Sequence, residues 1–327
     1  MHFTHRQYLH LSLPVILLSL MLSACVQNSL AYITNQGDNT VSVIDTKQQK
    51  VIKTITVGKA PVGIATAASL QRVFVTNVED QNITVIDTNK NNVIHHIPVP
   101  GSPVGIAVAP DNQTLYVADW YSNRILAIDP LTYAILQEAT VKRAPAGIVV
   151  SPDNQRLYIA ARDSNEIIML DAQDLSSQQR TTVGKHPFGV SLSADGSMLV
   201  SVNVYDDTVS FIDTQTWEQT ILAVNDHPYC AVVSPDNQTL YVTNTLDENV
   251  SVIDIPSKEV ITTITVGETP EGISYDVENH LIFVANWGGN NTTVIDAKTN
   301  KVINTISVGD KPRAFGQFIL QKNSAIK

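Results

Sequence analysis

The residues of this chain that could do chemistry lie beside a proline that recurs along the sequence. Seven prolines are spaced 41 or 42 residues apart: Pro61, Pro103, Pro145, Pro187, Pro228, Pro270 and Pro312. Small residues flank the first three, whereas side chains that can bind or react flank the last four: His186, Phe188, His227, Tyr229, Glu271 and Arg313. Imidazole, carboxylate and guanidinium groups that converge on one point could perform acid–base catalysis. These six residues form the core of the candidate site.

Two histidines and a cysteine at these junctions suggest a metal site as an alternative. His186, His227 and Cys230 carry the imidazole and thiol groups that zinc prefers as ligands. The histidines occupy equivalent positions in neighbouring repeats, so the sequence does not reveal their separation. Cys230 follows His227 by three residues around a proline, which assures no contact between a nucleophile and its base. We therefore assign no metal, no cofactor and no catalytic residue.

Glu271 and Arg313 come from adjacent repeats, and the two side chains could form a catalytic pair or a simple ion pair on the protein surface. An exposed ion pair contributes little to stability. We expect the junction side chains to be exposed. Replacing His227, Glu271 and Arg313 together by Ala should then leave the melting temperature nearly unchanged.

Aromatic residues mark a second set of loops that should open onto the same face. These loops carry Trp120, Tyr121, Arg162, Tyr205 and Trp287. Aromatic rings beside polar groups at a concave mouth suit the capture of a ligand or partner. We add Trp120 and Trp287 to the candidate site. The alternative is that both rings only cover the edges of β-sheets as packing residues.

The elements that position these residues are read from a repeat of about 42 residues. An aspartate ends an apolar run at Asp45, Asp87, Asp129, Asp171, Asp213, Asp254 and Asp296. Each unit predicts four short strands, for example 104–109, 114–118, 125–128 and 132–140, separated by Pro, Asp, Asn and Gly. Because the aspartates recur in every copy, we interpret them as turn residues whose carboxylates accept N–H groups.

Seven repeats of four strands predict an all-β, closed seven-bladed β-propeller of antiparallel strands over residues 31–321. The chain begins with the second strand of a unit, at residues 31–35, and ends with an isolated first strand, at residues 314–320. Joining the two completes the last blade from both termini and leaves no long free edge.

The repeated strings resemble a known family. Tyr-Val-Thr-Asn at Tyr241–Asn244, Val-Ile-Asp endings and Val-Gly-x-x-Pro-x-Gly junctions are similar to the YVTN β-propeller repeats, including YncE-like periplasmic propellers. The resemblance covers residues 29–321. It implies an extracytoplasmic protein. Some relatives are described as DNA-binding or as associated with redox and quinoprotein systems, and others resemble lactonases, but fold does not transfer function.

The first residues of the chain predict a targeting signal. A weakly basic start precedes the apolar run 11–22, which is too short to span a bilayer comfortably. The run ends in Leu22-Ser23-Ala24-Cys25, which resembles the bacterial lipobox. We expect a signal peptide over 1–24, lipidation of Cys25, a linker over 25–30 and a tail over 322–327. The residue after Cys25 is Val26, whereas an Asp at this position resembles a signal for retention in the inner membrane. We therefore expect the protein in the outer membrane, facing the periplasm.

The junction and loop residues favour a binding protein, with an enzyme as the alternative. The net charge of −10 and the absence of a basic run argue against nucleic-acid binding. We expect a monomeric, lipid-anchored binding or scaffold module for an envelope protein or small ligand, which meets the membrane only through its anchor. The first alternative is a lactonase-like hydrolase that uses Glu271, Arg313 and a histidine. The second is binding of single-stranded nucleic acid by the aromatic loops.

Overall fold

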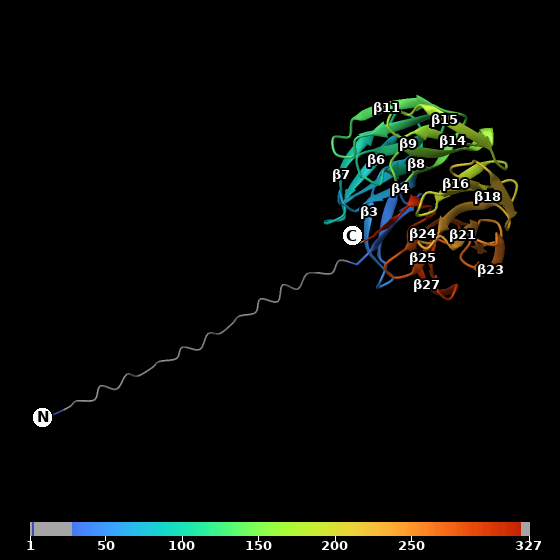
Figure 1. The fold of residues 1–327 in the computed structure, drawn as a ribbon. Coiled ribbons are helices and arrows are strands. Elements are labelled where there is room, and N and C mark those ends of the chain that lie inside the picture. Colours follow the sequence, from blue (N-terminus) through green and yellow to red (C-terminus); the bar gives the residue numbers. More distant parts are fainter. Residues whose placement is uncertain (1, 3–27, 322–327) are drawn as a thin grey trace.

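The computed structural model describes residue 2 and residues 28–321, and the expected signal peptide, Cys25 and residues 322–327 lie outside them. In the described part, the strands form seven sheets around a central axis, as Figure 1 shows. No helix among the described residues is long and apolar enough to cross a membrane. The prediction of an all-β, seven-bladed propeller is confirmed.

Each blade has four strands in order from the axis to the outside; the innermost strand of blade 1 is β29 (Ile319–Leu320), and the sheet of blade 2 carries a fifth strand at the axis, β28 (Phe315–Gln317). Blade 1 has β1 (Leu30–Asn35), β2 (Thr40–Asp45) and β3 (Lys50–Thr56); blade 2 has β4 (Pro61–Ala67), β5 (Arg72–Asn77), β6 (Asn82–Asp87) and β7 (Asn92–Pro98); blade 3 has β8 (Pro103–Val108), β9 (Leu115–Asp119), β10 (Arg124–Ile128) and β11 (Ile135–Thr140); blade 4 has β12 (Pro145–Val150), β13 (Arg156–Ala161), β14 (Glu166–Asp171) and β15 (Ser177–Thr182). Blade 5 has β16 (Pro187–Leu192), β17 (Met198–Asn203), β18 (Thr208–Asp213) and β19 (Gln219–Ala223); blade 6 has β20 (Pro228–Val233), β21 (Thr239–Asn244), β22 (Asn249–Asp254) and β23 (Glu259–Thr265); blade 7 has β24 (Pro270–Asp276), β25 (Leu281–Asn286), β26 (Asn291–Asp296) and β27 (Lys301–Ser307). A single turn of 3-10 helix, η1 (Arg162–Ser164), follows β13.

The Tyr-Val-Thr-Asn string recurs because its polar side chains join strands and blades. In blade 2, the Asn77 side chain donates at 2.8 Å to both Asn82 and Thr84, which closes the hairpin between β5 and β6. Thr76 donates to the carbonyl of Val104 in the next blade at 3.1 Å. The side chains of Thr76, Asn77 and Thr84 are fully buried, so these hydrogen bonds satisfy atoms that water cannot reach.

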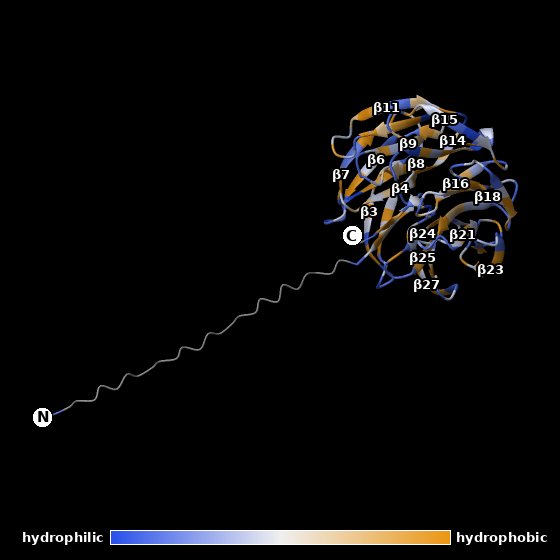
Figure 2. Cartoon of the chain, in the orientation of Figure 1, coloured by the Kyte–Doolittle hydropathy of each residue, from blue (hydrophilic) through white to orange (hydrophobic). Residues whose placement is uncertain are grey.

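The recurrent aspartates hold the outer turns, as the sequence predicts. In blade 3, the Asp129 carboxylate accepts the N–H groups of Leu131 and Thr132 at 2.8 and 3.0 Å, and these bonds lower the pKa of Asp129. The turn delays the outer strand, which begins at Ile135 and not at Thr132 as expected. Figure 2 shows the result for the whole disc, with apolar strands and polar turns.

Neighbouring inner strands approach so closely that they require glycine. A Cβ on Gly63 would lie 2.0 Å from the carbonyl oxygen of Val104, and one on Gly105 would lie 1.9 Å from that of Ala146. The inner ring is therefore narrow, and residues that enter it are forced against one another.

Both termini complete blade 1, but the closing strand is broken. β29 (Ile319–Leu320) pairs antiparallel with β1, whereas β28 (Phe315–Gln317) pairs parallel with β4 of the next blade. The expected continuous strand over 314–320 is thus wrong in its middle. Gly316 lies within β28, where it adopts a φ of +123°, a conformation available to glycine, and where a Cβ would lie 2.4 Å from the carbonyl oxygen of Ile64. The chain changes from the sheet of blade 2 to that of blade 1 at Phe318, between β28 and β29. Phe315 lies before this step, in the part of the chain that pairs with β4.

Candidate functional site

Residues of the four unusual junctions line one cavity. Its volume is about 460 Å³. All seven blades contribute to its lining, which consists of Gln36, Val62, Val78, Ser102, Val104, Trp120, Tyr121, Arg162, His186, Phe188, Val204, Tyr205, His227, Tyr229, Thr245, Thr269, Glu271 and Arg313. The strands of a blade alternate in direction, so residues that enter the inner strands and residues that leave the second strands reach the same face.

Two aromatic rings that line this cavity, those of Phe188 and Tyr229, pack on a third, Phe315, which is not among the lining residues. The ring of Phe188 lies 4.3 Å from that of Tyr229 and 4.7 Å from that of Phe315, measured between centroids. Trp120 continues the surface, with its ring 5.8 Å from that of Phe188. The broken closing strand matters here, because it places Phe315 beneath the two junction aromatics.

Beside these rings lies an ion pair that is buried and not exposed on the protein surface. The Arg313 Nε donates to a carboxylate oxygen of Glu271 at 2.6 Å, and Arg313 Nη2 donates to the hydroxyl of Tyr229. The side chains of Glu271 and Arg313 are only 9% and 21% exposed. Burial raises the pKa of the Glu271 carboxyl, and the charge of Arg313 opposes this rise.

This burial corrects the expectation of exposure for Glu271 and Arg313, which are largely buried, whereas the His227 side chain is 37% exposed. Replacing Glu271 and Arg313 together by Ala removes both charges, but it also removes two largely buried side chains and the Arg313 donor of the Tyr229 hydroxyl. The triple substitution of His227, Glu271 and Arg313 should therefore lower the melting temperature. The pairing also leaves the Glu271 carboxylate engaged by Arg313, so it is not placed as a free general base.

The upper wall contains stacked aromatic and basic side chains. The His186 ring stacks on Tyr205 with centroids 4.1 Å apart, and Tyr205 lies 5.5 Å from the ring of His227. The Arg162 guanidinium lies 4.8 Å from the centroid of the Trp120 ring and pairs with Asp163 at 3.2 Å. Burial lowers the pKa of His186, and the charge of Arg162 lowers it further.

The backbone aims both histidines toward the cavity. His186 and His227 have φ values of 51° and 52°, in the left-handed region, as do the residues at the equivalent positions of other blades. The N–H of His186 donates to the side chain of Asn165, and that of His227 donates to the side chain of Asp207, each at 3.0 Å. An Asn or Asp from the preceding blade thus fixes each junction.

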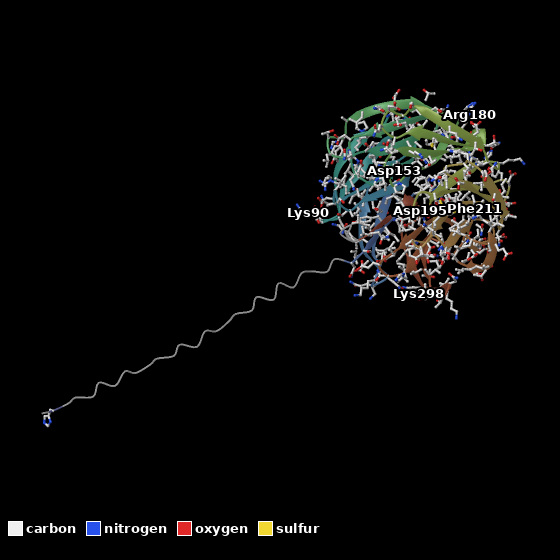
Figure 3. The ribbon with its side chains drawn as sticks, in the orientation of Figure 1. Lys90, Asp153, Arg180, Asp195, Phe211 and Lys298 are labelled. Carbon is white, nitrogen blue, oxygen red and sulfur yellow. The ribbon has the colours of Figure 1, made fainter. Side chains whose placement is uncertain are left out.

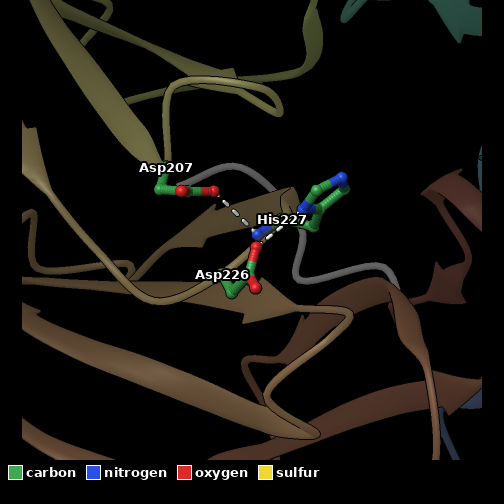
Figure 4. A group of neighbouring side chains, drawn as sticks. All are labelled: Asp207, Asp226 and His227. Atoms are coloured by element: carbon green, nitrogen blue, oxygen red, sulfur yellow. Dashed lines mark hydrogen bonds and ion pairs between the residues drawn. The ribbon is translucent and has the colours of Figure 1, made fainter.

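A metal centre at His186, His227 and Cys230 is not formed. Among the described residues, the group whose three ligand atoms lie within 4.8 Å of one another is Asp207, Asp226 and His227, shown in Figure 4. Asp226 pairs with Nδ1 of His227 at 2.7 Å, and Asp207 accepts the backbone N–H described above. Cys230 is buried, and burial raises the pKa of its thiol, so it is neither exposed nor ionised.

Comparison with known proteins identifies the family. A model of the YNCE-like beta-propeller family matches residues 149–323, more than half of the chain. The chain belongs to the YNCE-like β-propellers. This confirms the resemblance seen in the repeated strings. None of the curated proteins compared matches the chain.

Solved structures show the same fold at low identity. A functionally unknown protein from Desulfotomaculum acetoxidans is 18% identical, with a TM-score of 0.79 and coverage of 90% of this chain and 100% of that one. Hydrazine synthase from Kuenenia stuttgartiensis is 20% identical, with a TM-score of 0.73 and coverage of 81% and 91%. A protein from Lactobacillus plantarum is 18% identical, with a TM-score of 0.75 and coverage of 88% and 98%. These likenesses establish the fold alone, which as a class supports binding of ligands or proteins.

The structure of this YNCE-like propeller gathers most of the candidate residues but not all. The cavity is lined by His186, Phe188, His227, Tyr229, Glu271, Arg313 and Trp120. Trp287 is not among the lining residues; its Nε1 donates to the Gln36 side chain at 3.2 Å and Lys311 covers its ring. Gln36, which follows Asn35 of the first string, was missed, although the equivalent position in another blade holds Trp120.

Proposed function

We propose that this YNCE-like propeller is a binding protein whose channel-mouth cavity takes a planar aromatic ligand carrying a negative charge. One observation supports this most directly: seven of the lining residues carry aromatic rings, namely Trp120, Tyr121, His186, Phe188, Tyr205, His227 and Tyr229. Flat rings of a ligand gain from stacking on such surfaces beyond the area they bury. The cavity volume of about 460 Å³ is in the range of small-molecule sites.

The charged groups around the cavity support an anion over a cation. Its lining carries two arginines, Arg162 and Arg313, and one carboxylate, Glu271, which is already bonded to Arg313. The guanidinium groups also lie over ring faces, at 4.8 Å from Trp120 and 5.8 Å from Tyr229. A cationic ligand would compete for those faces and would be repelled by the charges that occupy them.

Calorimetric titration with three small probes tests this proposal. We expect 2-naphthoate to bind more tightly than cyclohexanecarboxylate, which lacks a flat ring, and than 2-naphthylmethylammonium, which has the opposite charge, by about tenfold in each case. Equal affinity for all three, or no binding of 2-naphthoate, would overturn the proposal.

Matched variants locate the binding. Phe188→Leu should weaken 2-naphthoate binding, whereas Tyr133→Leu, which changes a ring stacked on His95 outside the cavity, should not. Arg162→Gln should reduce the preference for the carboxylate over the ammonium probe, whereas Arg180→Gln on the outer strand β15 should leave it intact. Melting temperatures identify any variant that is simply misfolded.

We further propose that the protein is anchored in the bacterial envelope through Cys25, most simply in the outer membrane facing the periplasm. The lipobox-like string Leu22-Ser23-Ala24-Cys25 supports this assignment. Mass spectrometry of the mature N-terminus should find an acylated Cys25. A mature chain that begins at an unmodified Val26, or that retains Met1, would contradict it.

A further inference from the structure

The outer edges of three consecutive blades differ in charge from the other four. The outer turns and strands of blades 7, 1 and 2, residues 296–307, 45–56 and 87–98, contain six lysines and only their three turn aspartates. The corresponding residues of blades 3 to 6, 129–140, 171–182, 213–223 and 254–265, contain eight acidic and two basic residues. The six lysines, Lys47, Lys50, Lys53, Lys90, Lys298 and Lys301, are called the lysine rim below.

The lysine rim is continuous and exposed because ring closure makes these blades neighbours. The outer strand β3 contacts β27 on one side and β7 on the other. All six lysines are exposed, and Lys53 donates to the backbone carbonyl of Lys90 at 3.0 Å across two blades. Figure 3 places Lys90 and Lys298 at the edge of the disc, with Arg180 on the far side.

Apolar side chains accompany the lysines. Val51, Ile52, Ile94, Val302 and Ile303 lie on the same three outer strands and are between 36% and 50% exposed. Exposed aliphatic side chains next to lysines are the combination found where a protein rests on a lipid headgroup layer. The outer strands of blades 3, 5 and 6 also expose aliphatic side chains, so the lysines distinguish this edge from the others.

The N-terminal residues of the disc lie at this same edge. Asn28 donates to the Asp45 carboxylate at 2.8 Å, at the start of the turn that carries Lys47. β1 then runs away from that turn to Asn35, and the next residue, Gln36, lines the cavity. Asn28 and the lysine rim therefore lie at one end of the strands, and the cavity lies at the other end. Cys25 precedes Asn28 by three residues, which span at most about 11 Å.

We propose that the lysine rim lies on a bilayer of anionic phospholipid and turns the cavity away from it. Elsewhere the acidic chain, of net charge −10, is repelled by such a surface, so the rim sets the orientation. A lipid anchor at Cys25 would bring this edge within reach of the headgroups. The cavity at the other face would then remain open to ligand.

Lysine acetylation footprinting of the mature protein on vesicles tests the orientation. On vesicles with about 30% phosphatidylglycerol, the rim lysines should react at least about threefold more slowly than Lys59 and Lys142, which lie at the cavity face. On neutral phosphatidylcholine vesicles and in detergent this difference should vanish. Equal reactivity of both sets on the anionic vesicles, or protection that persists in detergent, as between two copies of the chain, would overturn the proposal.

Charge-reversal variants and an anchor-independent assay complete the test. Lys50→Glu with Lys301→Glu should abolish the protection, whereas Lys142→Glu with Lys185→Glu, a cavity-face pair of equal charge change that leaves Lys59 as the reference, should not. If mass spectrometry finds no acyl chain, the same protein is sedimented with the vesicles. It should then pellet with anionic vesicles alone and be released between about 0.05 and 0.5 M NaCl. Failure to pellet would refute the lysine rim, independently of the anchor and of ligand binding.

Discussion

Replacing Glu271 by Leu should destabilise the propeller far more than a change at a channel rim would. The substitution leaves the Arg313 guanidinium, 21% exposed, without the carboxylate that it contacts at 2.6 Å. Removing one partner of a buried ion pair costs about 3–5 kcal/mol, and the partial exposure of Arg313 favours the lower end, about 3 kcal/mol. With an unfolding entropy of about 0.6 kcal/mol/K for about 290 residues, this corresponds to a fall of about 5 °C in melting temperature.

A double-mutant cycle separates the pair from the loss of either side chain. Arg313→Met alone should also destabilise, because it leaves the Glu271 carboxylate buried and unpaired. The double variant should cost less than the sum of the two, by about 2 kcal/mol, since two apolar groups need no partner. Lys185→Met is the matched control. Lys185 pairs with Asp206 at 3.1 Å but is 68% exposed, so its loss should cost less than about 0.5 kcal/mol.

Urea unfolding followed by circular dichroism and tryptophan fluorescence measures these free energies. Coincident transitions by the two probes are required before the cycle is calculated. If Glu271→Leu unfolds within about 0.5 kcal/mol of the parent protein and the cycle is additive, the pair is not buried in solution and the reasoning fails.

Three further predictions follow from other parts of the molecule. Deleting residues 314–327 removes β28 and β29 and exposes the edges of β1 and β4, so the shortened protein should aggregate or lose cooperative unfolding. Deleting only residues 322–327 should have neither effect. Equal stability of the two truncated chains would show that the ring is not closed there. The buried Cys230 thiol, whose pKa burial raises, should react with a thiol reagent only after unfolding, and rapid reaction of the native protein would contradict its placement. Because the pKa of His186 is lowered in the folded state, its contribution to stability should be full above the ordinary value of 6.5 and fall as the pH drops below it. His186→Phe, which keeps a ring on Tyr205, should remove this part of the acid sensitivity of the melting temperature, and an unchanged pH profile from about 7.5 to 5 would count against it.

Local rules were enough to predict the blades and the face of the site. An aspartate at the end of an apolar run holds its turn by bonds within three residues, as Asp129 does, and such contacts can be read from spacing. Seven sequence repeats of equal length predict a closed ring of seven blades. Because strand direction alternates within each blade, the seven proline junctions then lie on the same face of the ring. The candidate residues His186, Phe188, His227 and Tyr229 therefore lie together around one cavity.

Burial at the centre of the ring was decided only by the tertiary structure. Glu271 and Arg313 are far apart in sequence, and whether their charges face water or Tyr229 depends on how the inner strands crowd the axis. The break between β28 and β29 lets Phe315 pack on Phe188 and Tyr229, because ring closure needs the last residues to serve two blades. The lysine rim likewise joins residues from both ends of the chain, since blade 7 becomes the neighbour of blade 1 only when the ring is closed. Local spacing carries no information about contacts of this kind, because closing the ring sets the distance between segments that no turn connects.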